Sequence, residues 1–351
     1  MLNELASKIK TEALKQGFIL VGITTPAPSP HLSTYLDWLD AGRHASMGYL
    51  ADVRARERRA DPNLILPQAK SILFLAGPYP NPKLAPVRPT SDVEKNEGRI
   101  SSYAWNDDYH LTLQEKLKNI VTFIEKEVGH PVPNRWYTDT GAIQEKDLAQ
   151  RAGLGWIGRN TCLINPKLGS YFFIAEIFLG IKLPPDEPFA TDHCGTCTRC
   201  ISACPTQAIL LNRTLDTNRC ISYLTIENKG EISEELRPKL DNLIFGCDIC
   251  QEVCPWNKEK PVRFNATIDP HPNLIKELSL TPQEFNKKFK KNPIKRAKRR
   301  GYLRNVAVAL GNAGNPNAIP ALEKAQDDIE PLVRVHAKWA LRAIKRKGEK
   351  C

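Results

Sequence analysis

Eight of the ten cysteines in this chain fall within one segment, between residues 194 and 254. The first four, Cys194, Cys197, Cys200 and Cys204, follow the spacing C-x2-C-x2-C-x3-C, and a proline comes directly after them. Bacterial ferredoxins use this spacing, because three thiolates on a tight loop reach three corners of one [4Fe–4S] cubane while the fourth reaches a different cluster. The spacing therefore predicts iron–sulfur chemistry and the transfer of single electrons.

A second cysteine run completes the ligands for two clusters. Cys247, Cys250 and Cys254 repeat the pattern and are followed by a proline, but the run lacks its leading cysteine, and Cys220 is the natural substitute. The ferredoxin arrangement predicts two sets of ligands for two [4Fe–4S] clusters. One set is Cys194, Cys197, Cys200 and Cys254, and the other is Cys204, Cys220, Cys247 and Cys250.

Structural zinc is the alternative for such a segment. Zinc sites usually bring two separated cysteine pairs around one tetrahedron, whereas three cysteines at successive x2 spacing fit a cubane better. Cysteines this dense in a reducing compartment indicate metal binding and not disulfides. We do not expect Cys162 or Cys351 to be ligands, since Cys162 lies in an apolar, strand-like run where a thiol usually packs in a core.

The elements that must position these cysteines alternate between helices and strands. Hydrophobic periodicity predicts helices over residues 2–16, 109–128 and 144–152, and strands over 18–23, 71–76, 136–138 and 171–179. We therefore predict an α+β protein with four parts. These are an α/β body over residues 1–185, a ferredoxin-like two-cluster domain over 186–260, a linker over 261–280 and a basic helical domain over 281–351.

The helical C-terminal part is weakly repetitive. Residues 303–310 resemble residues 333–340, 30 positions later, with a segment rich in Gly and Asn between them. Helix pairs at such a period are typical of HEAT-like repeats. Two repeats alone are marginal in stability, so we expect them to pack against the rest of the chain.

Positive charge is concentrated in the same part of the chain. The net charge is +11, yet residues 281–351 alone carry 18 Lys and Arg against 6 Asp and Glu. Such asymmetry indicates a polyanionic partner, and the alternative is a solvated face that only aids solubility. The candidate contacts to a nucleic acid are Lys295, Arg296, Lys298, Arg299, Arg300 and Arg304.

One motif in the body is misleading. Residues 153–158 match G-x-G-x-x-G, but they follow a predicted helix and lead toward a strand, the reverse of a dinucleotide-binding fold. Gly153 is better interpreted as the glycine that ends the preceding helix. We also expect a cytoplasmic monomer without a membrane partner, because the most apolar stretch, residues 171–183, is too short to span a bilayer.

Several segments, in order along nearly the whole chain, together resemble epoxyqueuosine reductases. They are residues 60–71, residues 100–110 with Asp108-Tyr109-His110, Thr138-Asp139-Thr140, residues 151–158, the ferredoxin cysteines, and residues 220–227 and 292–301. The resemblance implies a cobalamin-dependent oxidoreductase, akin to reductive dehalogenases. Such an enzyme reduces epoxyqueuosine to queuosine at the wobble position of tRNA, the last step of queuosine biosynthesis. An external one-electron donor of the ferredoxin or flavodoxin type is implied as well.

The resemblance also implies roles for particular residues. Asp139 corresponds to the family's proton donor; the alternative is a helix cap, because it precedes the helix predicted at 144–152. The implied cobalamin contacts are Arg59, Ala104, Asn160, Gly169, Ser170 and Ser222. The chain departs from the family at Ser102, where members often carry Arg. It lacks an Asp-x-His-x-x-Gly motif, so we expect base-off cobalamin without a protein histidine on cobalt.

Two competing functions remain open at this point. The first is a reductive dehalogenase-like oxidoreductase, which the basic helical tail and the missing export signal disfavour. The second is a non-catalytic electron-transfer or RNA-binding module. A carrier would not need a body of this length beside its two clusters, so an enzyme is favoured.

Overall fold

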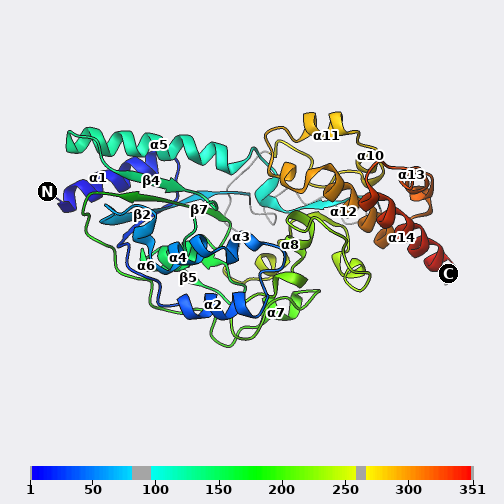
Figure 1. The fold of residues 1–351 in the computed structure, drawn as a ribbon, viewed down its shortest axis with the longest axis horizontal. Coiled ribbons are helices and arrows are strands. Elements are labelled where there is room, and N and C mark those ends of the chain that lie inside the picture. The colour runs from blue at the N-terminus through cyan, green and yellow to red at the C-terminus, as the bar shows by residue number, and fades with distance from the viewer. Residues whose placement is uncertain (1, 81–95, 258–265, 349–351) are drawn as a thin grey trace.

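A computed structural model describes residues 2–80, 96–257 and 266–348 of the chain. The molecule is elongated: a sheet with its covering helices lies at the N-terminal end, and a helical bundle lies at the C-terminal end (Figure 1). The cysteine segment runs between them. Cys351 and the first part of the predicted linker, residues 261–265, lie outside the described residues.

A four-stranded sheet forms the centre of the N-terminal body. Its strands are β1 (Leu20–Thr24), β2 (Ser71–Pro78), β7 (Phe172–Leu179) and β4 (Asn134–Tyr137), in the spatial order β1-β2-β7-β4. Every neighbouring pair is antiparallel. The body thus mixes helices and strands, as predicted, and its strands are not joined as parallel crossover units, which agrees with the α+β class. The strand positions themselves agree with the predicted ones.

Helices cover both faces of this sheet (Figure 1). On one face α1 (Leu2–Lys15) and α5 (Tyr109–Val128) pack their apolar stripes into a shared core with β2 and β7. On the other face α6 (Glu145–Arg151) packs over residues of β2 and β7. Burial on both faces explains why β2 and β7 are almost continuously apolar.

The glycine-rich turn after α6 ends that helix, as the sequence predicts. Gly153 has a φ of +80°, which an L side chain rarely adopts, and its N–H bonds back to Gln150 O. The chain then enters the hairpin of β5 (Trp156–Ile157) and β6 (Leu163–Ile164). A Cβ on Gly155 would lie 2.1 Å from Ile164 O, so only glycine fits this close approach.

Short elements frame the space beside the sheet. Three helices lie between β1 and β2, namely α2 (Leu32–Asp40), α3 (Gly48–Ala51) and α4 (Val53–Ala60). The cysteine segment contributes α7 (Arg199–Ala203), α8 (Ile221–Ile226) and α9 (Ile249–Glu252). Within the same region β3 (Arg99–Ile100) pairs in parallel with β8 (Leu243–Phe245). Single-turn helices lie at Pro62–Leu64, Ser102–Ala104, Thr217–Arg219, Arg237–Leu240, Pro293–Ala297 and Pro316–Ala318.

The C-terminal helices share one hydrophobic core with the cysteine segment. They are α10 (Leu274–Leu278), α11 (Pro282–Lys288), α12 (Lys298–Ala313), α13 (Ile319–Ala325) and α14 (Pro331–Gly348). Their core includes Ile100, Leu224 and Phe245 from earlier in the chain. The described part of the predicted linker, residues 266–280, contains α10, which buries Leu274 and Leu278 in this core. Among the described helices, none combines the length and apolar composition needed to cross a bilayer.

Candidate functional site

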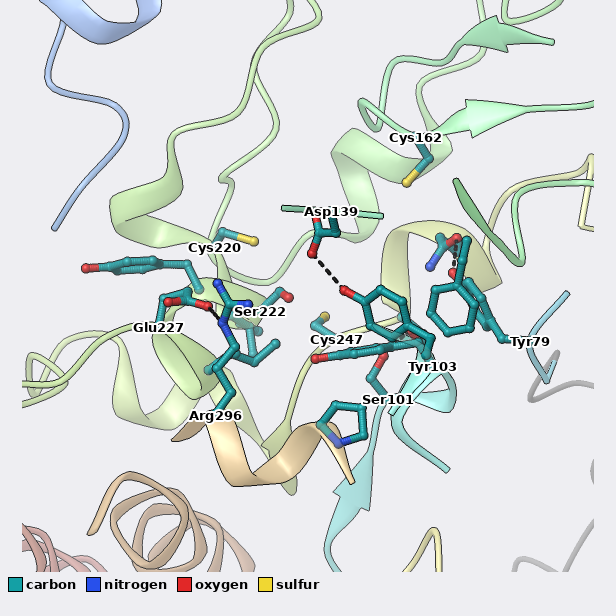
Figure 2. Close-up of a pocket in the computed structure, with 18 of the residues that line it drawn as sticks. Tyr79, Ser101, Tyr103, Asp139, Cys162, Cys220, Ser222, Glu227, Cys247 and Arg296 are labelled. Carbon is teal, nitrogen blue, oxygen red and sulfur yellow. Dashed lines mark hydrogen bonds and ion pairs between the residues drawn. The ribbon is translucent and has the colours of Figure 1, made fainter. Parts of the chain in front are cut away.

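A large pocket opens between the sheet body and the cysteine segment (Figure 2). Its volume is about 1000 Å³. Side chains from β7, α5, α8 and the segment before α12 line it, so it is assembled from all three regions of the chain. Cys204, Cys220, Cys247 and Cys250 all reach this pocket, and these are the four cysteines predicted as one ligand set.

The other predicted set surrounds a different, much smaller cavity. Cys194, Cys197, Cys200 and Cys254 line it together with Trp256. The structure thus separates the eight cysteines into the same two groups as the ferredoxin spacing. The inner group faces the large pocket, and the outer group lies beside the exposed side chain of Arg199.

The inner cysteines are held in an environment suited to iron ligands. The N–H of Ala208 donates to Cys204 Sγ at 3.3 Å. Burial raises the pKa of Cys220, and burial raises the pKa of Cys247 to about 12. Because burial disfavours the ionised form of these thiols, a bound cation such as iron would be needed to hold them as thiolates.

Asp139 lies on the loop that follows β4, facing the cysteines across the pocket (Figure 2). The backbone has a φ of +55° there, which is unusual for a residue other than glycine. Tyr109 Oη donates a hydrogen bond to Asp139 Oδ2 at 2.7 Å. The helix-cap alternative is wrong, because Gln144 occupies the N-cap position of α6.

Tyr109 is a functional residue that the sequence argument did not single out. Its ring stacks on Phe173, with centroids 4.1 Å apart and planes at 9°. Burial, followed by the charge of Asp139, raises the pKa of Tyr109, so its hydroxyl stays protonated as the donor. The segment Asp108-Tyr109-His110, which resembles the family, could have pointed to Tyr109. Asp108 caps α5 and thereby places Tyr109 on the first turn of that helix.

Cys162 was predicted to pack in a core, and this is wrong. Its side chain lines the large pocket (Figure 2), near enough to Cys250 to influence the pKa of the Cys250 thiol. The apolar pattern around it misleads because its neighbours Leu163 and Ile164 form β6, while Cys162 itself lies just before that strand.

A second pocket of about 1010 Å³ adjoins the first and shares Asp139, Glu145 and Lys146 with it. Of the six predicted cofactor contacts, three line these pockets. Asn160 and Ser222 line the first, and Arg59 lines the second, where its guanidinium lies 5.5 Å from the centroid of the Tyr35 ring.

The other three predicted contacts lie elsewhere. Ala104 has no exposed surface and packs in the C-terminal core, so it is unable to touch a ligand. Gly169 and Ser170 are buried against Asn257, whose Oδ1 accepts the N–H of Ser170 at 2.7 Å. Ser102, the departure from the family, is also fully buried and donates its N–H to Asp248.

Basic side chains form the mouth of the large pocket. Lys290, Lys291, Lys295 and Arg296 line it, and Arg296 forms an ion pair with Glu227 (Figure 2). This segment is fastened to the start of α5. The Asn292 side chain donates to Ala104 O at 2.7 Å and to Asn106 O at 2.9 Å, and the N–H of Asp108 donates to Lys291 O at 2.6 Å.

Only part of the predicted nucleic-acid tract is available to a polyanion. Lys295, Arg296 and Lys298 are exposed, and Arg300 is half-buried. Arg299 is bound to Asp328 and to Leu280 O. Arg304 is wrongly predicted as a contact, because it is fully buried and its guanidinium donates to the carbonyl oxygens of Leu224, Asn228 and Gly230.

Comparisons with known proteins bear on both halves of the site. Residues 59–140 match the family model described as "Epoxyqueuosine reductase QueG, DUF1730", and residues 193–257 match a "4Fe-4S double cluster binding domain". The chain is 39% identical to an epoxyqueuosine reductase of Pseudomonas aeruginosa, over 96% of this chain and 94% of that protein. It is 38% identical to an epoxyqueuosine reductase of Aliivibrio fischeri, over 97% of this chain and 91% of that protein.

Two solved structures are similar over nearly the whole chain. One is an epoxyqueuosine reductase with an epoxyqueuosine-modified tRNA-Tyr stem loop, at a TM-score of 0.89 and 32% identity, covering 98% of this chain and 91% of that one. The other is a Bacillus subtilis epoxyqueuosine reductase whose catalytic aspartate loop is swung out of the active site. Its TM-score is 0.87 at 32% identity, with 98% of this chain and 91% of that one covered.

Proposed function

The chain belongs to the epoxyqueuosine reductase family, and from this we propose that it reduces epoxyqueuosine to queuosine at the wobble position of tRNA. The observation that carries the proposal is the large pocket, where four cluster cysteines face Asp139 below a rim of lysines. One cavity thus combines a source of electrons, a source of protons and a surface for a polyanion. This is what the reduction of an epoxide within an RNA requires.

The chemistry sets the tasks of the residues. Conversion of an epoxide to an alkene and water breaks two C–O bonds and consumes two electrons and two protons. We propose that the cysteines of each set hold one [4Fe–4S] cluster. Electrons from a ferredoxin- or flavodoxin-type donor would enter at the outer set, beside exposed Arg199, and reach the pocket through the inner set.

Cobalamin is the group that the family places in such a pocket, and the residues present fit it. Two adjoining cavities near 1000 Å³ each are large for a protein site and suit a broad ring with a nucleotide tail. Asn160, Ser222 and Arg59 are the side chains that would hold it. When bound, cobalamin supplies a strongly reducing cobalt centre.

Asp139 is proposed as the acid that protonates the departing oxygen. It faces the pocket opposite the inner cysteines, and its carboxyl is oriented by the hydroxyl of Tyr109. The Bacillus subtilis relative carries a catalytic aspartate on a loop that swings out of its active site. The strained backbone at Asp139 supports the same role for its loop, because such strain is concentrated where function requires it.

For the RNA we propose a footprint on the exposed lysines at the pocket mouth, Lys290, Lys291 and Lys295, together with Arg296 and Lys298. Phosphates bound here would leave a wobble nucleotide free to be turned out of its stack and into the pocket. The helices α12 to α14 behind this rim are proposed to be a HEAT-like unit. Because tRNA is the substrate, we also propose that the protein acts in the cytoplasm. We propose separately that it acts as a monomer.

The direct test uses protein purified without oxygen and reconstituted with iron, sulfide and cobalamin. It is incubated with epoxyqueuosine-containing tRNA and an artificial one-electron reductant, and nucleosides are then identified by mass spectrometry. We expect queuosine to appear at the expense of epoxyqueuosine. Protein that carries both clusters and cobalamin yet leaves the epoxide intact would contradict the proposed function.

A further inference from the structure

Two carboxyl groups, the fully buried Glu176 and the half-buried Glu145, lie against the loop that carries Asp139. Glu176 projects from β7 with no exposed surface, and neither of its carboxyl oxygens has a hydrogen-bond partner among the described residues. Glu145 opens α6, and its Oε1 is likewise buried and unpartnered within the same part of the chain. Burying an unpaired carboxyl group costs stability, so a site that holds two of them has a use for them.

Both groups contact the Asp139 loop. The backbone of Asp139 lies close enough to the Glu145 carboxyl group to lower its pKa. Glu176 lies opposite Tyr137 in the sheet, and a Cβ on Gly141 would be only 3.1 Å from Glu176 Oε1. The loop therefore rests on the two glutamates, and glycine at 141 is what lets it approach so closely.

Glu145 and Glu176 lie close enough for the charge of one to influence the ionisation of the other. Burial, and then the charge of Asp139, raises the pKa of Glu145 to about 8, while Lys146 and Arg59 act in the opposite direction. Burial raises the pKa of Glu176 well above its usual range, and Glu145 and Asp139 raise it further. At neutral pH both glutamates therefore hold protons directly behind the proposed acid.

We propose that Glu145 and Glu176 are a proton store that recharges Asp139 within each reduction. The inference rests on the proposed function, in which one oxygen atom leaves as water and needs two protons. Glu145 passes its proton to Asp139, which gives it to the oxygen as the first C–O bond breaks, and the Glu176 proton then reaches Asp139 through Glu145. After the second C–O bond breaks, Asp139 delivers the second proton to the departing hydroxide. The two electrons arrive through the clusters, and water refills the store through the pocket.

Glutamine substitutions test the store because Gln keeps the shape and the neutral state but carries no transferable acid proton. Single-turnover rates of epoxyqueuosine reduction are measured across pH for Glu145→Gln and Glu176→Gln, with Glu125→Gln on α5 as the matched control. Glu125 accepts the N–H of Val132 at 3.0 Å, which a Gln oxygen also does. We expect the wild-type rate to fall above pH 8, and each store variant to lose about tenfold or more.

Chemical rescue distinguishes proton donation by Glu145 from a purely structural role of this residue. Glu145→Ala leaves room for a small acid, so its rate is expected to rise with imidazole buffer concentration, while Asp139→Asn shows no such rise. If the wild-type protein does not reduce epoxyqueuosine, this result refutes the proposed function and does not bear on the proton store. If the wild-type protein is active, the inference is overturned by a Glu145→Gln or Glu176→Gln variant that keeps the wild-type rate and pH profile. It is also overturned if the variants lose the same fraction of the rate at every pH and imidazole does not restore the rate of Glu145→Ala. If Glu176→Gln does not fold, the rates of Glu145→Gln and Glu145→Ala still test whether the store exists.

Discussion

Lys295 and Arg304 lie in the same basic tract, but the structure predicts opposite consequences for replacing them. Lys295 is exposed at the pocket mouth, whereas Arg304 is fully buried beneath α8. We expect Lys295→Gln to weaken tRNA binding without changing stability. For Arg304→Gln we expect a loss of stability with little change in the salt dependence of tRNA binding.

The size of each effect follows from the groups that each side chain binds. One lysine that neutralises a phosphate contributes about 0.7 to 0.9 to the slope of log K against log salt, so Lys295→Gln makes the slope shallower by about that much. Replacing Lys290, Lys291 and Lys295 together makes it shallower by roughly 2 to 3. Arg304→Gln deprives three buried carbonyl groups of their donors, at about 1 to 3 kcal/mol each, so we expect a loss of about 3 kcal/mol or more.

Two assays separate these outcomes. Fluorescence anisotropy with a labelled anticodon stem loop, repeated over a range of salt concentrations, gives the slope for each variant. Urea unfolding gives the free energy of unfolding. The reasoning is refuted if Arg304→Gln lowers the salt slope as much as Lys295→Gln does while remaining as stable as wild type, because a buried guanidinium would then be binding phosphate.

Three further predictions concern the pocket. Asp139→Asn should lower the single-turnover rate by about 100-fold or more, with iron content and tRNA affinity unchanged. Tyr109→Phe should lower the rate less. A wild-type rate for Asp139→Asn would contradict the assignment of Asp139 as the acid. Cys220→Ser should reduce iron from about eight to about four per chain, and iron analysis showing no loss would contradict its ligand role. Glu176 has a raised pKa in the folded state, so the folded chain keeps a proton that the unfolded chain releases above its usual pKa of 4.5. Glu176 therefore makes stability fall as pH rises above 4.5, by about 1.4 kcal/mol per pH unit. In urea unfolding at two pH values, Glu176→Gln should remove this share of the fall and leave the share that Glu145 contributes up to its pKa of about 8.

The sequence predicts most of the elements and the cysteine grouping because both are local patterns. The helix at 109–128 and the strands at 71–76 and 171–179 follow from periodicity, and the two cysteine sets follow from spacing. Burial of individual polar groups is not local. Nothing near Arg304 in the sequence distinguishes it from exposed Lys298, since its partners come from residues 224–230.

The same limit applies to the acid and its surroundings. Asp139 was found through family resemblance, but Tyr109 and Glu176 meet it only because α5, β4 and β7 come together in the fold. Glu176 lies within the apolar run of β7, and the sequence alone does not show what is next to it. Only the antiparallel register, which sets it opposite Tyr137, shows that it lies next to the loop with the acid.

The hydrogen bonds between Asn292, Lys291 and the start of α5 have a mechanical consequence. The segment that we propose to bind the anticodon arm is held by these hydrogen bonds against the first turn of α5, which carries Tyr109 and thereby the hydrogen bond to Asp139. In this proposal, the distance between the bound phosphates and the carboxyl group of Asp139 is fixed by the fold and does not depend on a flexible linker. Lengthening the chain between residues 291 and 298 would therefore misalign the modified base with Asp139, even where the affinity for tRNA survived.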